Sequence, residues 1–145
     1  MRYLTSFALT LVFGHALAGE AKPFVVEPSS KAISSNHLVE PFGIETLGGV
    51  FTPFIEAGCS LPCTHTTVFS TAEDNQTQIL IHLYRGHGTR VAKLTALGTL
   101  SISGIPSAPR GTPKVSVTLG AVGADLVISA TEPSGAKLTI MRVVR

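Results

Sequence analysis

The sequence predicts a single all-β domain, an antiparallel β-sandwich, on the strength of three observations. The chain has 145 residues of which 44% are hydrophobic, which is enough for one small buried core and too short for two ordinary domains. Fourteen glycines, nine prolines and no tryptophan favour strands and turns over helices. From about residue 43 onward, apolar and polar residues alternate between turn residues, which is typical of strands.

Composition also excludes several classes of protein. Charged residues make up only 14% of the chain and the formal net charge is +2, so the sequence predicts no nucleic-acid partner. A low charge content together with many apolar residues also disfavours intrinsic disorder.

The first 18 residues read as a signal peptide. Arg2 is followed by an apolar run over residues 4–13, and Ala16-x-Ala18 predicts cleavage after Ala18. The run is too short to cross a bilayer, so no membrane span is expected. A buried N-terminal strand is the alternative, and the single arginine disfavours a mitochondrial transit peptide. We therefore expect a secreted protein, or one in the lumen of the secretory pathway or the periplasm.

Residues 19–41 are expected to form a flexible arm, because prolines and serines interrupt the scattered apolar positions and no period persists. The β-sandwich domain is then expected over residues 42–145.

Four runs in the second half of the chain have strand character: residues 78–84, 114–119, 126–130 and 138–144. In the first of them both faces carry large side chains, which predicts a strand buried on both sides. Clusters of glycine and proline separate the runs at the spacing expected of a sandwich.

The motifs of nucleotide and hydrolase chemistry are missing from the sequence. It contains no Gly-x-x-x-x-Gly-Lys-Ser/Thr loop and no Gly-x-Ser-x-Gly elbow, and its acidic residues form no clear carboxylate pair. These observations predict a protein that is not an enzyme.

Cys59 and Cys63 are the only cysteines and are candidates for a disulfide in an exported protein. A metal site would have to recruit His65, His82 or His87, but Cys-x-x-x-Cys without a second ligand pair is a weak zinc pattern, so no metal is predicted. His82 alternates with apolar residues and is expected to pack within a sheet.

A candidate N-glycosylation site is present at Asn75, in the sequon Asn75-Gln76-Thr77.

Three stretches of the chain resemble one known family. They are residues 43–56 (GIETLGGVFTPFIE), 68–77 (VFSTAEDNQT) and 104–113 (GIPSAPRGTP). In order and spacing they resemble the peptide-binding β-sandwich of the heat-shock protein 70 (DnaK-type) chaperones, and the similarity extends over about residues 43–140.

The resemblance implies a chaperone-like module that binds extended hydrophobic peptides or unfolded proteins. By position, the resemblance assigns three groups of residues. A pocket for one aliphatic side chain consists of Ile44, Phe69, Ile79, Ile81 and Val115, and an arch over the peptide consists of Leu47 and Ala72. Backbone groups at Thr46, Ser70 and Gln76 contact the peptide.

The departures from the family pattern carry further expectations. Relatives use ATP through a preceding domain, and a helical lid follows their sandwich. Neither the ATP-binding domain nor the lid is expected in this chain. We therefore expect that the chain uses no cofactor and binds peptide independently of ATP. A separate chaperone chain is then a candidate partner. Asp74 and Arg110 match positions that latch the lid in relatives. The turn at residues 120–125 is shortened relative to the family, which leaves its register open.

Two other interpretations stay open at this stage. Periodicity alone favours an ordinary core for the five pocket residues, and only the family resemblance favours a pocket. The chain would then be a structural or interaction protein with an unused groove, or a truncated product of the same family.

Overall fold

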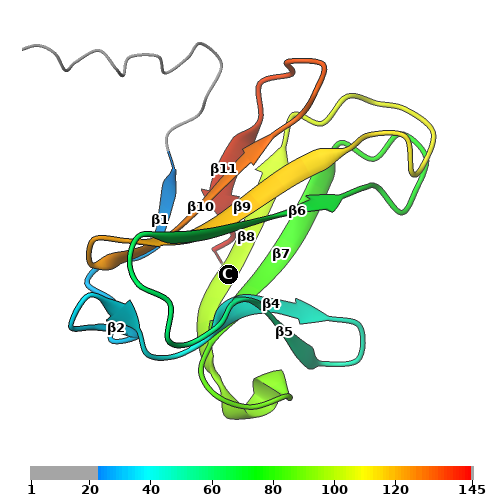
Figure 1. Ribbon diagram of the computed structural model, residues 1–145. Coiled ribbons are helices and arrows are strands. Elements are labelled where there is room, and N and C mark those ends of the chain that lie inside the picture. The colour runs from blue at the N-terminus through cyan, green and yellow to red at the C-terminus, as the bar shows by residue number, and fades with distance from the viewer. Residues whose placement is uncertain (1–22, 145) are drawn as a thin grey trace, which may run out of the picture.

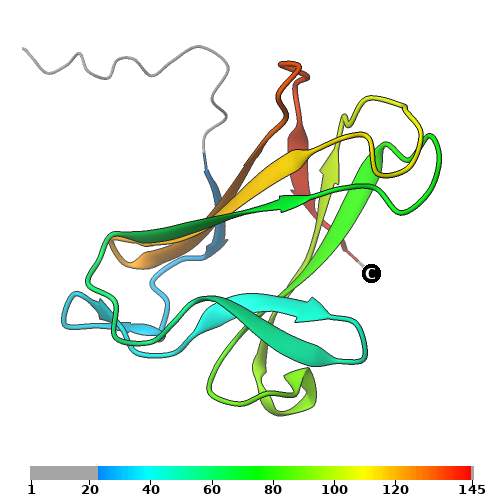
Figure 2. The ribbon, with the colours of Figure 1, turned by 45° about the vertical axis from the view of Figure 1, so that its right-hand side comes forward.

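The computed structural model describes residues 23–144 as an antiparallel β-sandwich, and Figures 1 and 2 show its two layers. The prediction of an all-β fold is confirmed: the only helix in this range is the 3₁₀ turn η2 (Val91–Lys93). The described part of the chain holds no helix long and apolar enough to span a bilayer. The predicted signal peptide and residues 19–22 lie outside the described residues.

The strands in chain order are β1 (Phe24–Glu27), β2 (Ile33–Ser34), β3 (His37–Leu38), β4 (Phe42–Thr46), β5 (Val50–Ile55), β6 (Cys63–Phe69), β7 (Gln78–Arg85), β8 (Thr95–Ser103), β9 (Val115–Val122), β10 (Asp125–Thr131) and β11 (Thr139–Arg142).

The strands form two main sheets. One has the order β1-β10-β9-β6 and the other the order β11-β8-β7-β4-β5, while β2 and β3 form a separate hairpin. The chain passes from one sheet to the other at β5–β6, β6–β7, β8–β9 and β10–β11. The β6–β7 and β8–β9 loops therefore lie at the same end of the sandwich, at the upper right of Figure 1.

The core lies between the two sheets and follows the period-two pattern of the sequence. In the four-stranded sheet Val117, Leu119 and Ala121 of β9 are opposite Ala130, Ile128 and Leu126 of β10, and all six side chains are buried. In the other sheet Ile81 is opposite Leu100. Each such aliphatic side chain contributes about 1.5–3 kcal/mol when it is fully buried.

The register left open at residues 120–125 is regular in the structure. Strand β9 continues to Val122 and pairs with Asp125 across a two-residue turn. Gly123 occupies this turn with φ +62°, a conformation that glycine adopts without a steric penalty.

The segment expected to be a flexible arm is ordered from Phe24 onward, so the expectation for this part is wrong. Strand β1 pairs with β10, and Val26, Ala32 and Leu38 are buried in the core. The serines that suggested a linker are turn residues: Ser29 and Ser35 have positive φ. These turns separate very short strands.

Strand β7 is not buried on both faces as predicted. Ile81 and Leu83 point into the core, whereas Leu80 on the opposite face is 53% exposed. His82 lies on that outer face and is partly buried, and its Nδ1 is 2.8 Å from the Thr99 hydroxyl oxygen. Only one layer covers this sheet within the described residues, so its outer face stays open to solvent.

Candidate functional site

The five predicted pocket residues lie on the inner faces of both sheets. Phe69 of β6 is directly opposite Val115 of β9 in the four-stranded sheet. Ile79 and Ile81 of β7 and Ile44 of β4 lie in the five-stranded sheet, and all five belong to one apolar cluster. Phe69 and Ile79 flank the β6–β7 loop, so this group reaches the loop end of the sandwich.

Burial divides these five residues into two groups. Val115, Ile81 and Ile44 are 0%, 4% and 6% exposed, respectively. Phe69 and Ile79 are only partly buried and pack against the edge of the core. A ligand that approaches between the loops therefore meets Phe69 and Ile79 first, with the other three behind them.

An aromatic row that the sequence analysis did not identify extends this apolar edge. The ring of Phe54 in β5 stacks on Phe69 at 6.2 Å between centroids, and it meets His65 edge-on at 5.5 Å. Strands β5 and β6 are edge strands of different sheets, so the row joins the two sheets. The alternation Cys63-x-His65-x-Thr67-x-Phe69 was the available signal, because it places His65 and Phe69 on one face.

The structure does not bring the two predicted arch residues together. Leu47, at the tip of the β4–β5 turn, is 97% exposed, so its side chain makes almost no contact with the rest of the protein, Ala72 included. The turn continues through Gly48 and Gly49, which both have positive φ. In Figures 1 and 2 this turn projects toward the same side of the molecule as the β6–β7 loop but lies apart from it.

Hydrogen bonds brace the β6–β7 loop from within. The Gln76 side-chain oxygen accepts from the amides of Ala72 (2.9 Å) and Glu73 (3.1 Å), and its Nε2 donates to the Gln78 carbonyl. The Ser70 hydroxyl donates to the Pro113 carbonyl at 2.6 Å. The Gln76 and Ser70 side chains thus hold the loop in shape.

The β8–β9 loop supports the β6–β7 loop from the other side. The Asp74 carboxylate accepts from the amide of Arg110 at 2.9 Å, and the Asn75 amide donates to the Ala108 carbonyl at 2.8 Å. The Asn75 side-chain oxygen accepts from the Ser107 hydroxyl, and Asn75 is exposed. Two loops distant in sequence therefore form one braced unit.

Thr46, the third predicted contact residue, lies at the end of β4. Its hydroxyl is 2.9 Å from that of Thr52 and 3.3 Å from the Val50 carbonyl oxygen. Thr46 therefore belongs to the β4–β5 hairpin and lies apart from the braced loops.

An open pocket of about 560 Å³ lies on the outer side of β7. Its lining consists of Ala72, Glu73, Gln76, Thr77, Gln78 and Leu80. The lining includes the predicted arch residue Ala72 and the predicted contact residue Gln76, but none of the five apolar pocket residues. The hollow therefore lies on the outward face of the braced loop.

Among residues 23–144 no three histidine, cysteine, aspartate or glutamate side chains gather as metal ligands would. His82 and His65 have the other roles described above, and Cys59 and Cys63 form a disulfide.

An ion-pair network lies at the far end of the sandwich from the braced loops. Arg85, which is buried, donates to Glu27 at 2.8 Å and to Glu40 at 2.6 Å. Burial of Glu27 opposes its ionisation, but hydrogen bonds from Arg85 and Ser30 outweigh that effect and lower the pKa of Glu27 below its usual value. This network fastens the N-terminal segment to β7.

Comparison with known proteins places this geometry in context. Residues 31–138 match the family model described as "Hsp70 protein". "Chaperone protein DnaK" of Anaplasma marginale (strain St. Maries) is 47% identical over 100 residues, which are 68% of this chain and 16% of that protein. "Chaperone protein DnaK" of Methanothermobacter thermautotrophicus is 44% identical over 108 residues, 72% of this chain and again 16% of the relative. The chain spans about a sixth of the length of these curated relatives.

Proposed function

Because the chain belongs to the heat-shock protein 70 family, we propose that its β-sandwich binds extended hydrophobic segments of unfolded proteins. One observation carries the proposal. All five positions that the resemblance assigns to the pocket are apolar, they form one cluster, and two of them, Phe69 and Ile79, remain partly exposed at the loop end.

The physical requirements of such binding support the proposal. An extended peptide needs main-chain partners along its length and a recess for alternate side chains. The braced β6–β7 loop supplies a fixed backbone next to Phe69 and Ile79. Burial of one leucine or isoleucine side chain of the peptide at this edge would contribute about 1.5–3 kcal/mol.

Leu47 is proposed as the mobile half of the arch. A fully exposed leucine on a Gly-Gly turn gains by covering an apolar ligand, because contact removes its side chain from water. Ala72 on the braced loop is the fixed half.

We further propose that peptide binding by this chain is independent of ATP and that the chain is not an enzyme. The sequence contains no Gly-x-x-x-x-Gly-Lys-Ser/Thr phosphate-binding loop. Nucleotide control, if the cell uses it, would come from a separate chaperone chain.

Export to an oxidising compartment is part of the proposal. The leader-like residues 1–18 and the Cys59–Cys63 disulfide support it, because disulfides persist in secreted and periplasmic proteins. In a eukaryotic secretory pathway the exposed Asn75 would then be available for glycosylation beside the groove.

Titration with a labelled heptapeptide tests the proposed function. A leucine-rich heptapeptide should bind with Kd near 1 μM, about −8 kcal/mol, measured by fluorescence anisotropy. A matched peptide whose central leucine is replaced by aspartate should bind at least tenfold more weakly, because its carboxylate must lose water. Equal affinity for the two peptides would contradict an apolar pocket.

A structural or interaction protein with an unused groove is the second candidate function. The near-complete burial of Val115, Ile81 and Ile44 favours it, since these side chains pack like ordinary core residues. The two candidates differ in whether the leucine-rich peptide binds at all.

A further inference from the structure

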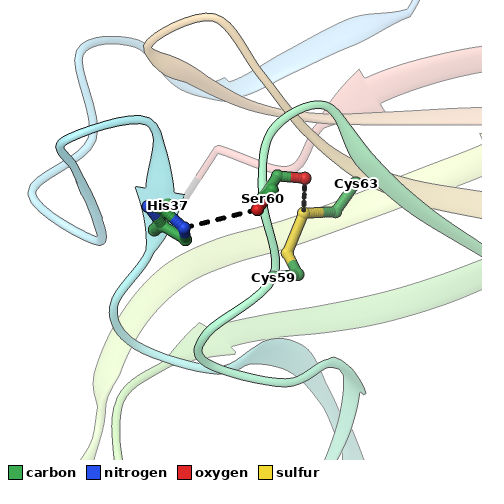
Figure 3. Close-up of a disulfide and its surroundings, with 4 residues drawn as sticks. All are labelled: His37, Cys59, Ser60 and Cys63. Carbon is green, nitrogen blue, oxygen red and sulfur yellow. Dashed lines mark hydrogen bonds between the residues drawn. A yellow bond between two sulfur atoms is a disulfide. The ribbon is translucent and has the colours of Figure 1, made fainter.

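The loop that joins β5 to β6 is closed by a disulfide. Cys59 and Cys63 are bonded and their Cα atoms are 6.4 Å apart. Figure 3 shows Ser60 between the ring of His37 and the disulfide. Both cysteines are partly buried, so a small reductant reaches the bond.

Backbone hydrogen bonds join this loop to the β2–β3 hairpin. The Leu38 amide donates to the Cys59 carbonyl (3.0 Å), the Gly58 amide donates to the Leu38 carbonyl (2.6 Å), and the Leu61 amide donates to the Asn36 carbonyl (3.0 Å). Every one of these bonds has one partner in residues 58–61, within or next to the disulfide ring.

A side-chain contact adds to the backbone bonds. His37 Nε2 lies 3.3 Å from the Ser60 hydroxyl oxygen, and Ser60 lies inside the ring between the two cysteines (Figure 3). The hairpin is thus held by the cross-linked loop through both backbone and side chain.

The hairpin covers apolar core. Leu38 is fully buried, and Ile33 and Leu61 pack against the same cluster as the two cysteines. Separation of the hairpin from the loop would expose this end of the core to solvent.

We propose that Cys59–Cys63 is a redox-controlled latch that holds the β2–β3 hairpin on the sandwich. A dithiol attacks one sulfur as a thiolate, the Cys59–Cys63 bond breaks, and a mixed disulfide forms. The second thiol of the reductant then displaces the protein sulfur. Two electrons and two protons pass to the protein, which holds two thiols, and the reductant becomes a disulfide.

The local chemistry suits both redox states. The Ser60 carbonyl oxygen lies 3.0 Å from Cys63 Sγ and accepts the hydrogen of the thiol after reduction. Reduction also gives residues 60–62 more conformational freedom. The cross-link restricts this freedom most in the state in which the hairpin is detached, so reduction favours that state. The latch goes beyond peptide binding and does not depend on it.

Hydrogen exchange on the full chain tests the latch. With dithiothreitol, the amides of Leu38, Gly58 and Leu61 should exchange about tenfold faster or more, while amides of β9 and β10 keep their rates. Binding of an apolar fluorescent dye should rise in parallel, because the covered core end opens.

The double variant Cys59→Ser/Cys63→Ser is the matched control. Its Leu38, Gly58 and Leu61 amides should exchange rapidly with or without dithiothreitol. If the variant fails to fold, reduction of the parent chain alone decides the outcome.

Three results would overturn the latch. Unchanged exchange at the three amides after reduction would show that the disulfide does not hold the hairpin. A uniform increase through β9 and β10 would mean that it stabilises the whole fold instead. Alkylation of both cysteines before any reductant is added would show that the bond is not formed.

Discussion

Ile79 is the pocket residue at which peptide binding and stability can be separated, because it is partly exposed on the same face of β7 as the buried Ile81. We expect Ile79→Phe to fill the recess and weaken binding of the leucine-rich peptide at least tenfold, about 1.4 kcal/mol. Its melting temperature should change little, since an open edge accepts added volume better than a packed interior. Anisotropy and thermal denaturation on the same variant measure both effects.

Ile140→Phe is the matched control, because Ile140 is also a partly buried isoleucine but lies on the edge strand β11, separated from Ile79 by Ile102 of β8. It should leave peptide affinity unchanged. If Ile79→Phe instead lowers the melting temperature by several degrees and its folded fraction binds peptide like the parent, Ile79 is ordinary core.

Leu47 offers a second residue-scale prediction. Its side chain is almost fully exposed, so Leu47→Ala should change the free energy of unfolding by no more than about 0.5 kcal/mol. Peptide should nevertheless dissociate several-fold faster, because the arch loses apolar contact, and affinity differences lie mainly in the dissociation rate. Stopped-flow displacement of labelled peptide measures this rate, and an unchanged rate would remove Leu47 from the site.

At the scale of elements, the ion pairs of Arg85 fasten the N-terminal segment to β7 and make stability depend on pH. The pKa of Glu27 is lowered in the folded protein, so its contribution is complete above the unfolded pKa and is lost as pH falls through the folded value. We expect Glu27→Gln to lower the free energy of unfolding by about 1–2 kcal/mol at pH 7. The difference between parent and variant should shrink as pH falls below about 4.5.

Urea denaturation at several pH values measures that difference. Glu56→Gln is the control, because Glu56 is exposed in the β5–β6 connection and lies in neither ion pair described for Arg85. A pH-independent difference for Glu27→Gln would show that the variant acts through packing rather than through charge.

Strands with a clear local pattern of apolar residues could be predicted from the sequence. Strands that form only because they pair with a distant strand could not. Residues 114–119 alternate clearly and residues 126–130 form a short β-branched run, and these segments are the central strands β9 and β10. Strand β1 has only four residues and gains its stability from pairing with β10, a long-range contact that local pattern does not encode.

The same reasoning applies to the site. The resemblance identified Phe69 and Ile79, but Phe54 contacts Phe69 and His65 only because two edge strands of different sheets meet. The separation of Leu47 from Ala72 also depends on how the β4–β5 turn projects, and Gly48 and Gly49 allow that turn more than one direction.

In the molecule as a whole, the two ends of the sandwich are stabilised by different contacts. The braced β6–β7 and β8–β9 loops lie at one end, whereas the disulfide loop and the ion pairs of Arg85 fasten the N-terminal segment at the other. Residues in contact couple more strongly than distant ones, so variants at the two ends should have additive effects on stability.

Magnesium-ATP is not expected to affect peptide binding by this chain. The sequence contains no Gly-x-x-x-x-Gly-Lys-Ser/Thr phosphate-binding loop, so no site for magnesium-ATP is expected. A nucleotide that does not bind cannot shift the equilibrium between peptide-free and peptide-bound protein. The Kd and dissociation rate of the leucine-rich peptide should therefore be the same with and without millimolar ATP, as measured by anisotropy and stopped-flow displacement. Leu47→Ala in the same assay shows that a changed dissociation rate is detectable. ATP-dependent peptide release by this chain alone would contradict the proposal, whereas release that requires a second purified chaperone chain would assign the nucleotide step to that partner.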